Sequence, residues 1–319
     1  MYALCIESSH RRGMGHFFRM LNVTKYLQQM KENYIVLLNN DTQSVSMLEQ
    51  RRIPYEIVDY ADVVSNWESE IIKKHQVDVW FLDKFSTSKE LVEHVKEQKV
   101  IVAGIDDCGP GAAGIDIHFC SMLFQDLKGE KIYCGKDYLI LNSDIEQYRR
   151  VRQKLNKIVV TLGGSDTYGV TVKVVEILKE LQLSADIIVG PHFKHMELLK
   201  EYANENFKIL SNVPSLIKCF QDYDLAITGG GVTCFEANAS GLPCIIVANE
   251  IHEIAIGKYL SKYGGARFAG YYKDISSKDF DLSNINIEEM SRAALQAIPL
   301  DGMDRIYKII DKDRKENAR

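Results

Sequence analysis

Short apolar runs alternate with amphipathic stretches along the first half of the chain. The runs are continuous rather than alternating, which is typical of strands in a parallel sheet covered on both faces. The predicted strands are Tyr2–Ile6, Tyr34–Leu38, Tyr55–Val58, Val77–Leu82, Lys99–Ala103, Ile117–Cys120 and Tyr138–Leu141. The predicted helices between them are Phe17–Met30, Val45–Arg51, Trp67–His75 and Ser88–Glu97. The pattern therefore predicts a doubly wound α/β domain.

A second series of the same kind follows the polar stretch 142–156, which is either a linker or a helix that crosses between domains. Its predicted strands are Lys157–Leu162, Ala185–Val189, Phe207–Ile209, Leu225–Thr228, Cys244–Val247 and Ala266–Phe268. Its predicted helices are Thr171–Leu181, Met196–Tyr202, Val213–Cys219, Val232–Ala239, Glu253–Tyr263, Ile287–Ala297 and Tyr307–Lys315. We expect two Rossmann-like domains, 1–150 and 151–319, with a cleft between them. Ligands of such sheets bind beyond the carboxyl ends of the strands.

Composition narrows the class of protein. The 319 residues are 46% hydrophobic and 26% charged, which is ordinary for a globular chain. A net charge of -5 without a basic run argues against a nucleic-acid partner. The seven cysteines are scattered without a CxxC pair, which argues against a disulfide framework and a zinc ribbon. No signal peptide or membrane span is evident, so we expect a cytoplasmic protein; the oligomeric state stays open.

The loop after the first strand holds the first candidate site. Gly13 and Gly15 allow a tight turn and a close approach of the backbone to a ligand. His16 falls at the helix start, where a neutral imidazole is favoured and is able to act as a general base. The alternative is a capping loop with a surface histidine. Arg19, one turn later, either holds phosphate or pairs with a carboxylate.

Two further loops of the first half carry carboxylates. Asp83 follows a buried strand, where it either orients a sugar hydroxyl or caps the next helix. Asp106 and Asp107 form a pair that suits metal or acid–base chemistry. For this pair we favour the structural alternative, which is solvation of a loop end and capping.

The second half repeats the arrangement of strand, glycines and helix. Gly163, Gly164 and Ser165 offer backbone N–H groups to a ligand at the cleft. Asp166 is a residue type that also caps a following helix.

The most informative loop is Gly229–Gly231, which joins a strand to the helix at Val232. The N-terminus of a helix after such glycines is an anion site, so Gly230, Gly231, Val232 and Thr233 are candidates for binding a diphosphate. Glu236 lies one turn into the helix, where it would accept hydrogen bonds from ribose hydroxyls. The spacing fits neither a P-loop nor the GxGxxG dinucleotide fingerprint. The alternative is a glycine turn without a ligand.

Six motifs follow one another in this chain: Gly13-Met-Gly15-His16-x-x-Arg19, Asp83-x-Phe85, Asp106-Asp107, Gly135-x-Asp-Tyr138, Gly163-Gly-Ser-Asp166 and Gly229–Glu236 with Gly241-Leu-Pro243. Their order and spacing, over about residues 1–270, resemble the PseG/SpsG family, which is related to GT-B glycosyltransferases such as MurG. PseG members hydrolyse UDP-2,4-diacetamido-2,4,6-trideoxy-β-L-altrose in pseudaminic acid biosynthesis. SpsG members are associated with spore-coat polysaccharide.

The resemblance implies a GT-B-like enzyme that hydrolyses a UDP-activated amino sugar. His16 matches the family's general base, which activates the attacking water. The Gly229–Thr233 turn and Glu236 match its nucleotide-binding helix, and no metal or cofactor is implied. The alternative is a glycosyltransferase that passes the sugar to an acceptor. A third reading, a binder without catalysis, has no need for a base at His16.

The chain departs from the family at two places. Phe85 stands where the family has a tyrosine, so a phenolic hydroxyl is missing. Ile251 and His252 stand where the family offers an Asn-Gln pair to phosphate and sugar, and His252 is a candidate replacement for the lost polar contact. Both changes leave the identity of the sugar and of the acceptor open.

Overall fold

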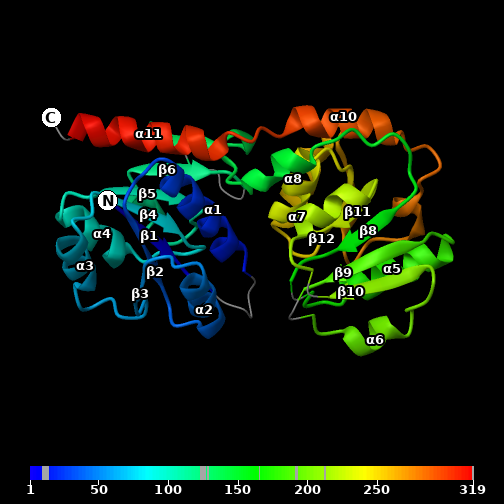
Figure 1. Cartoon of the computed structure of the whole chain (residues 1–319), viewed down its shortest axis with the longest axis horizontal. Helices are drawn as coiled ribbons and strands as arrows, with labels where there is room; N and C mark the ends of the chain where they lie inside the picture. Colours follow the sequence, from blue (N-terminus) through cyan, green and yellow to red (C-terminus); the bar gives the residue numbers. More distant parts are fainter. Residues whose placement is uncertain are drawn as a thin grey trace. The chain divides into compact units, whose positions relative to one another are not determined.

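A computed structural model describes residues 1–8, 14–122, 127, 129–164, 166–190, 193–211 and 213–317. Within these residues the chain forms two compact α/β units (Figure 1). One unit consists of the described residues up to Leu141 together with those from Asp301 onward. The other unit is built from Asn142–Leu300. Each is described here by itself.

The first unit contains a seven-stranded sheet in which all strands run parallel. The strands are β1 (Tyr2–Ile6), β2 (Tyr34–Leu38), β3 (Tyr55–Ile57), β4 (Val79–Asp83), β5 (Ile101–Ile105), β6 (Ile117–Cys120) and β7 (Ile132–Cys134). Their order in the sheet is β3-β2-β1-β4-β5-β6-β7. The direction of the order reverses between β1 and β4, which is where doubly wound sheets bind their ligands.

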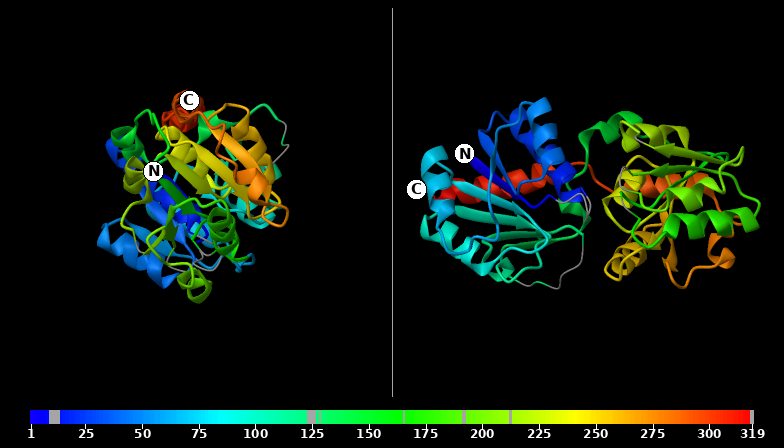
Figure 2. Two further views of the ribbon diagram at one scale, coloured as in Figure 1. Left: turned by 90° about the vertical axis from the view of Figure 1, so that its right-hand side faces the viewer. Right: turned by 90° about the horizontal axis from the view of Figure 1, so that it is seen from below.

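Helices cover both faces of this sheet, as alternating side chains require (Figure 2). Leu4 of β1 packs with Phe17 and Ile306 on the face covered by α1 (Gly15–Gln29), α2 (Thr42–Gln50) and α11 (Gly302–Asn317). Its neighbour Cys5 packs with Ile72 and Val95 on the face covered by α3 (Trp67–His75) and α4 (Lys89–Glu97). The continuous apolar strands of the sequence are therefore explained by burial on both sides.

The second unit contains a six-stranded sheet, also parallel throughout. Its strands are β8 (Ile158–Thr161), β9 (Ala185–Val189), β10 (Phe207–Ser211), β11 (Leu225–Thr228), β12 (Cys244–Ala248) and β13 (Ala266–Tyr271). Its helices are α5 (Val170–Glu180), α6 (Met196–Lys200), α7 (Leu216–Cys219), α8 (Val232–Ala239), α9 (Glu253–Ser261) and α10 (Ile287–Ala297). The strand order is β10-β9-β8-β11-β12-β13, so the reversal lies between β8 and β11.

The last helix belongs to the first unit, although we expected residues 151–319 to form the second domain. Ile306 and Ile310 of α11 are buried in the core of the first unit. Arg314 extends this contact with ion pairs to Glu32 and Asp78 at 3.0 and 2.8 Å. An amphipathic helix is placed by whatever buries its apolar face, which the local sequence does not reveal.

The other boundary lies after Leu141 rather than near residue 150. The Arg152 side chain is fully buried and donates hydrogen bonds to the carbonyl groups of Phe220, Tyr223 and Ser240. Arg150 donates to the carbonyl of Gln221 at 2.8 Å. These contacts tie the polar stretch into the second unit, where it begins as a 3-10 helix at Ser143–Tyr148 and continues without regular structure.

One predicted strand is wrong. Tyr138–Leu141 is not a strand; Leu139 and Ile140 are buried there without sheet pairing. The edge strand is β7, which pairs with β6 and ends before Gly135, a residue with φ of 107°. The other predicted strands are confirmed, with ends that move by a few residues. All seven cysteines are free thiols. In the described part of the chain no helix is both long and apolar enough to cross a membrane.

The assignment of α11 to the first unit predicts the effect of Ile306→Ala. Deleting this buried side chain is expected to destabilise the first unit by about 2–4 kcal/mol. Both tryptophans, Trp67 and Trp80, lie in the first unit, so urea unfolding followed by their fluorescence reports on that unit. The exposed Lys312→Ala on the same helix serves as control, with a change of about 0.5 kcal/mol or less. An unchanged fluorescence transition in Ile306→Ala would contradict the assignment.

Candidate functional site

In the first unit the predicted histidine and the first predicted carboxylate meet at the reversal of the strand order. His16 is the second residue of α1, which follows β1, and Asp83 is the last residue of the neighbouring β4. Nδ1 of His16 lies 2.6 Å from Oδ1 of Asp83. The His16 side chain is 30% exposed, while Asp83 is fully buried. The imidazole is therefore anchored at one nitrogen and still reachable from solvent.

The charge state of Asp83 fixes the tautomer of His16. Burial acts to raise the pKa of Asp83, but the charge of Arg19 and, after it, the contact with His16 outweigh burial and hold the pKa at about 2. An ionised carboxylate only accepts hydrogen bonds, so Nδ1 of His16 carries the hydrogen, and in the neutral ring the lone pair is on Nε2. Such an imidazole is oriented as a general base.

Arg19 binds carboxylates, which is the second of the two roles considered from the sequence. Its Nε and Nη2 donate to the two oxygens of Asp83 at 2.9 and 2.5 Å. Its Nη1 donates to Oδ2 of Asp106 at 2.6 Å. The side chain is only 7% exposed, so the guanidinium belongs to the buried framework behind His16.

The two adjacent carboxylates after β5 have separate structural partners. Asp106 accepts hydrogen bonds from Oγ of Ser121 at 2.8 Å and from the backbone N–H of Met122 at 3.0 Å. Asp107 accepts from the N–H groups of Thr87 and Gly109 at 3.1 and 2.8 Å. Both carboxylates are buried, and Asp106 also pairs with Arg19, so their role here is structural but is not the loop-end solvation and capping that we expected. Across the described residues, no three His, Cys, Asp or Glu side chains are grouped so as to hold a metal ion.

In the second unit the glycine turn after β11 is shaped by α9, which the sequence did not reveal. A Cβ on Gly230 would lie 2.6 Å from Cβ of Glu253, and one on Gly229 would lie 2.8 Å from Nδ2 of Asn249. Oε2 of Glu253 accepts hydrogen bonds from the N–H groups of Gly230 and Asn249 at 3.2 and 2.7 Å. The missing side chains of Gly229 and Gly230 thus leave room for Asn249 and Glu253, and the N–H of Gly230 already donates to Glu253. A Cβ on Gly231 would meet no atom of the described residues within 4 Å, so this glycine is open as far as they extend.

The start of α8 remains the best candidate for an anion site. No side chain of the described residues caps this helix at Gly231, so the N–H groups at Val232 and Thr233 face outward from its first turn. Glu236 follows one turn later, half-buried, and within the described residues it has neither an ion pair nor a hydrogen-bond partner. Burial raises its pKa to about 7. Hydroxyl groups of a ligand that donate hydrogen bonds would stabilise the ionised form of such a half-buried carboxylate.

The other glycine loop of the second unit offers less to an anion. Gly163 has φ of 101°, a conformation that favours glycine. Asp166 caps α5 by accepting from the N–H groups of Val170 and Thr171 at 2.8 and 2.7 Å, so these amides are already engaged. Gly164 packs closely against Gly190. Gly15 opens α1, with no atom within 4 Å of a Cβ placed there. Two predicted residues, Gly13 and Ser165, lie outside the described residues.

The positions that depart from the family pattern are exposed. Phe85, two residues after Asp83, is 55% exposed, and Ile251 is 74% exposed. His252 is exposed directly before the start of α9. The side chains of Phe85 and Ile251 are therefore open to solvent.

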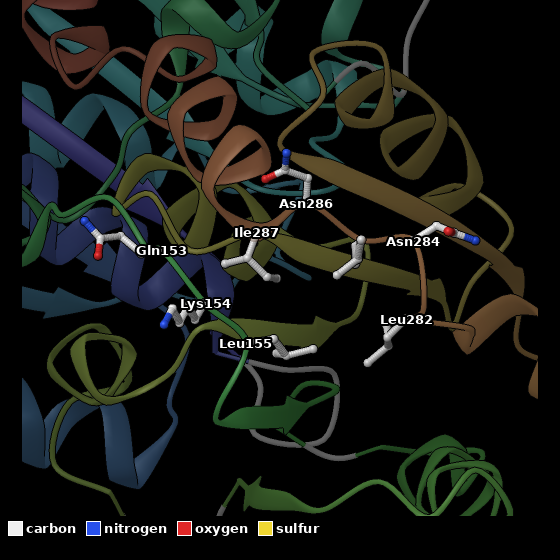
Figure 3. A pocket seen from close by; sticks show the side chains of 8 residues that line it. Gln153, Lys154, Leu155, Leu282, Asn284, Asn286 and Ile287 are labelled. Carbon is white, nitrogen blue, oxygen red and sulfur yellow. The ribbon is translucent and has the colours of Figure 1, made fainter.

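A surface hollow of about 470 Å³ lies elsewhere in the second unit (Figure 3). Its walls are the segment 153–155 and the segment 282–287, with Leu155, Leu282 and Ile287 among the side chains that project into it. None of the predicted site residues lines it. The hollow is thus distinct from both strand reversals.

Sequence relatives cover most of the chain, although no family model matches it. Uncharacterized protein MJ1062 of Methanocaldococcus jannaschii is 26% identical over 316 residues, which are 90% of this chain. The chain spans 64% of the length of that relative. The spore coat polysaccharide biosynthesis protein SpsG of Bacillus subtilis is 21% identical over 287 residues, covering 82% of this chain and 80% of SpsG.

Solved structures share the two-unit fold. MurG of Acinetobacter baumannii superposes with a TM-score of 0.71 at 16% identity, over 98% of this chain and 99% of MurG. Anabaena Alr3699/HepE, solved in complex with UDP, gives 0.68 at 14% identity, over 98% of this chain and all of that one. The spinosyn rhamnosyltransferase SpnG, solved with thymidine diphosphate, gives 0.63 at 12% identity over 96% of both chains.

The chain resembles SpsG in sequence and MurG in fold. This confirms the resemblance to the PseG/SpsG family and the GT-B-like fold class predicted from the motifs. At these levels of identity the solved structures establish the fold alone. The roles of individual residues rest on the geometry described above.

The low pKa of Asp83 predicts how Asp83→Asn behaves in acid. A carboxyl whose pKa is depressed by folding adds stability above its unfolded pKa, about 3.9, and loses it as pH falls toward 2. We expect Asp83→Asn to cost at least about 2 kcal/mol at pH 7 and the gap to wild type to narrow by about half by pH 3. Urea unfolding by tryptophan fluorescence measures both values.

The exposed Asp59→Asn provides the matched control for this series, since it removes a carboxylate that takes no part in the network. A pH-independent gap between Asp83→Asn and wild type would show that Asp83 is not held ionised by its neighbours.

Proposed function

We propose that the protein is a GT-B-type enzyme that uses a UDP-activated sugar in the biosynthesis of a surface polysaccharide, transferring the sugar to an acceptor hydroxyl. The sequence similarity to SpsG supports the polysaccharide assignment. The similarity to HepE, which was solved with UDP, supports a uridine nucleotide. The similarity to SpnG, a rhamnosyltransferase, supports transfer. The reaction needs no metal ion or cofactor in this proposal.

The observation that carries the proposal is the pairing of His16 with Asp83 at the reversal between β1 and β4. Nε2 of His16 takes the proton from the attacking hydroxyl as its oxygen bonds to the anomeric carbon. The bond between that carbon and the diphosphate oxygen breaks, and UDP leaves with the electron pair. The imidazolium that results is stabilised by the ionised Asp83.

The second unit supplies the nucleotide site in this proposal. The N–H groups at the start of α8, at Val232 and Thr233, and the positive end of the helix stabilise the charge that develops on the diphosphate. Gly231 is open to the close approach of a phosphate. Glu236 accepts hydrogen bonds from the ribose hydroxyls, which supplies the partners that it lacks among the described residues.

Hydrolysis is the second candidate, because the motif around His16 resembles that of the PseG hydrolases. The same base would then activate water, and the free sugar would be an amino sugar for a pseudaminic-type acid. The His16 geometry serves both reactions equally. The two reactions are distinguished by whether turnover requires an added acceptor.

The role of His16 is tested with His16→Gln and a UDP-sugar such as UDP-N-acetylglucosamine. We expect turnover to fall by at least about 100-fold because the base is lost, while UDP affinity changes little. Release of UDP is measured with and without a panel of acceptor alcohols. Turnover that requires an acceptor supports transfer, and turnover in water alone supports hydrolysis. His195→Gln, a histidine of the second unit, is the control. Full activity in His16→Gln would overturn the mechanism.

The role of Glu236 is tested by the pH dependence of nucleotide-sugar binding. The ionised carboxylate accepts hydroxyl hydrogens much more strongly than the neutral acid, so with a pKa of about 7 binding should weaken by up to about tenfold from pH 8 to pH 6. Calorimetry is done in the His16→Gln background, which removes turnover and the second titrating group. A UDP-sugar is used because its diphosphate is esterified on both sides and does not titrate in this range.

Adding Glu236→Gln should weaken binding at pH 8 by about tenfold and abolish the pH dependence. Glu180→Gln on the exposed face of α5 is the matched control. Equal affinity at both pH values in the parent protein, or an unchanged profile in Glu236→Gln, would remove Glu236 from the ribose site.

A further inference from the structure

The pairing of His16 with Asp83 is embedded in a longer chain of charges. Arg19 contacts Asp83 through two nitrogens and Asp106 through a third. Asp106 is fixed in turn by the hydroxyl of Ser121. The carboxylates and Ser121 stand at or just beyond the ends of β4, β5 and β6, which are neighbours in the sheet. The order of contacts is therefore His16, Asp83, Arg19, Asp106 and Ser121.

A fully buried carboxylate requires a cation or several donors nearby. Two groups in contact with Asp83 are able to supply positive charge, Arg19 and His16. Arginine is always charged, whereas histidine becomes charged only by taking up a proton. Without Arg19, the burial of Asp83 would favour a protonated His16. An imidazolium has no lone pair and cannot remove a proton from a hydroxyl.

We propose that Arg19 is a positioning residue whose permanent charge compensates the buried Asp83, so that His16 is not needed as the cation and stays neutral and able to accept a proton. Asp106 balances Arg19, which would otherwise oppose the proton that His16 must accept. With a neutral His16, the three groups Arg19, Asp83 and Asp106 sum to one negative charge. Uptake of a proton by His16 then neutralises the cluster. This inference rests on the proposed function only in so far as it assigns His16 the role of base.

Other titratable groups near this cluster in the described residues are Lys84, Asp107 and His118. Lys84 follows Asp83, but its ammonium lies 3.7 Å from the ring centroid of Tyr60. Asp107 is engaged by the N–H groups of Thr87 and Gly109. His118, on β6, feels the charges of Asp107 and Asp106, but burial outweighs them and lowers its pKa, so it adds no positive charge at neutral pH. The balance around His16 is thus set by Asp83 directly and by Arg19 and Asp106 behind it.

The charges of Arg19 and Asp106 predict that removing one or the other shifts the protonation of His16 in opposite directions. Arg19→Gln removes the competing cation, so the pH at which the His16 ring takes up its proton should rise by about one unit or more. Asp106→Asn removes an anion and leaves Arg19 unbalanced, so that pH should fall by up to about one unit. Ser121→Ala removes a hydrogen bond to Asp106 without a change of charge and should leave it near the wild-type value.

Nitrogen-15 NMR of the histidine rings, with His16 assigned by its loss in His16→Gln, follows this protonation in the full chain without any substrate. The acidic limb of the turnover profile should move in the same directions. Arg19→Lys keeps the charge but loses the two-pronged contact, so it should retain the protonation pH while lowering turnover. A purely structural role would lower turnover at every pH and would not shift the NMR titration.

Circular dichroism verifies that each variant is folded. Opposite shifts in Arg19→Gln and Asp106→Asn support the proposal. Shifts in the same direction, or none in a folded Asp106→Asn, overturn it. If Arg19→Gln does not fold, Asp106→Asn compared with Ser121→Ala decides alone. Because the NMR titration needs no turnover, opposite NMR shifts in a protein that proves inactive toward UDP-sugars would uphold the charge arrangement and refute the proposed function.

Discussion

The buried carboxylate of Asp83 is the constraint on which the first unit's site depends. It has no exposure to water, and its partners among the described residues are Arg19 and His16. These two residues are three apart on α1 and therefore lie on the same side of the helix. Breaking a buried ion pair of this kind costs about 3–5 kcal/mol. The carboxylate thus fixes the rotation of the first turn of α1 against the end of β4, and with it the direction of the imidazole.

In both units the candidate site residues lie where the strand order reverses, but the first unit presents side chains there and the second presents backbone N–H groups. In the first unit, the reversal between β1 and β4 brings side-chain charges together, and the group that we propose to face the ligand is a titratable ring. In the second, the reversal between β8 and β11 brings together glycine loops and the start of α8. Side chains that move protons must be oriented by other side chains. Backbone N–H groups are oriented by the helix itself, and that arrangement suits a diphosphate.

The sequence predicted the parts of this structure that depend on local pattern. Strands buried on both faces are continuous apolar runs, and nearly all of them were located. The role of Gly229 and Gly230 could not be predicted, because it depends on Glu253, which is more than twenty residues away along the chain. The place of α11 depends on contacts with Glu32 and Asp78 that are still more distant. His16 and Asp83 were both singled out, but nothing local showed that they are partners.

In the proposed reaction, His16 as the base and the changed surface positions bear on different steps. The same imidazole removes a proton from water or from an alcohol, so the network around His16 does not choose between hydrolysis and transfer. That choice depends on which hydroxyl is held beside it and on how well water is excluded. Phe85 and Ile251 are exposed apolar side chains at positions where the PseG/SpsG pattern offers polar groups. They cannot orient a water molecule by hydrogen bonding, and they add apolar surface that an acceptor is able to cover. The departures from the family therefore favour a change of acceptor with the base chemistry preserved.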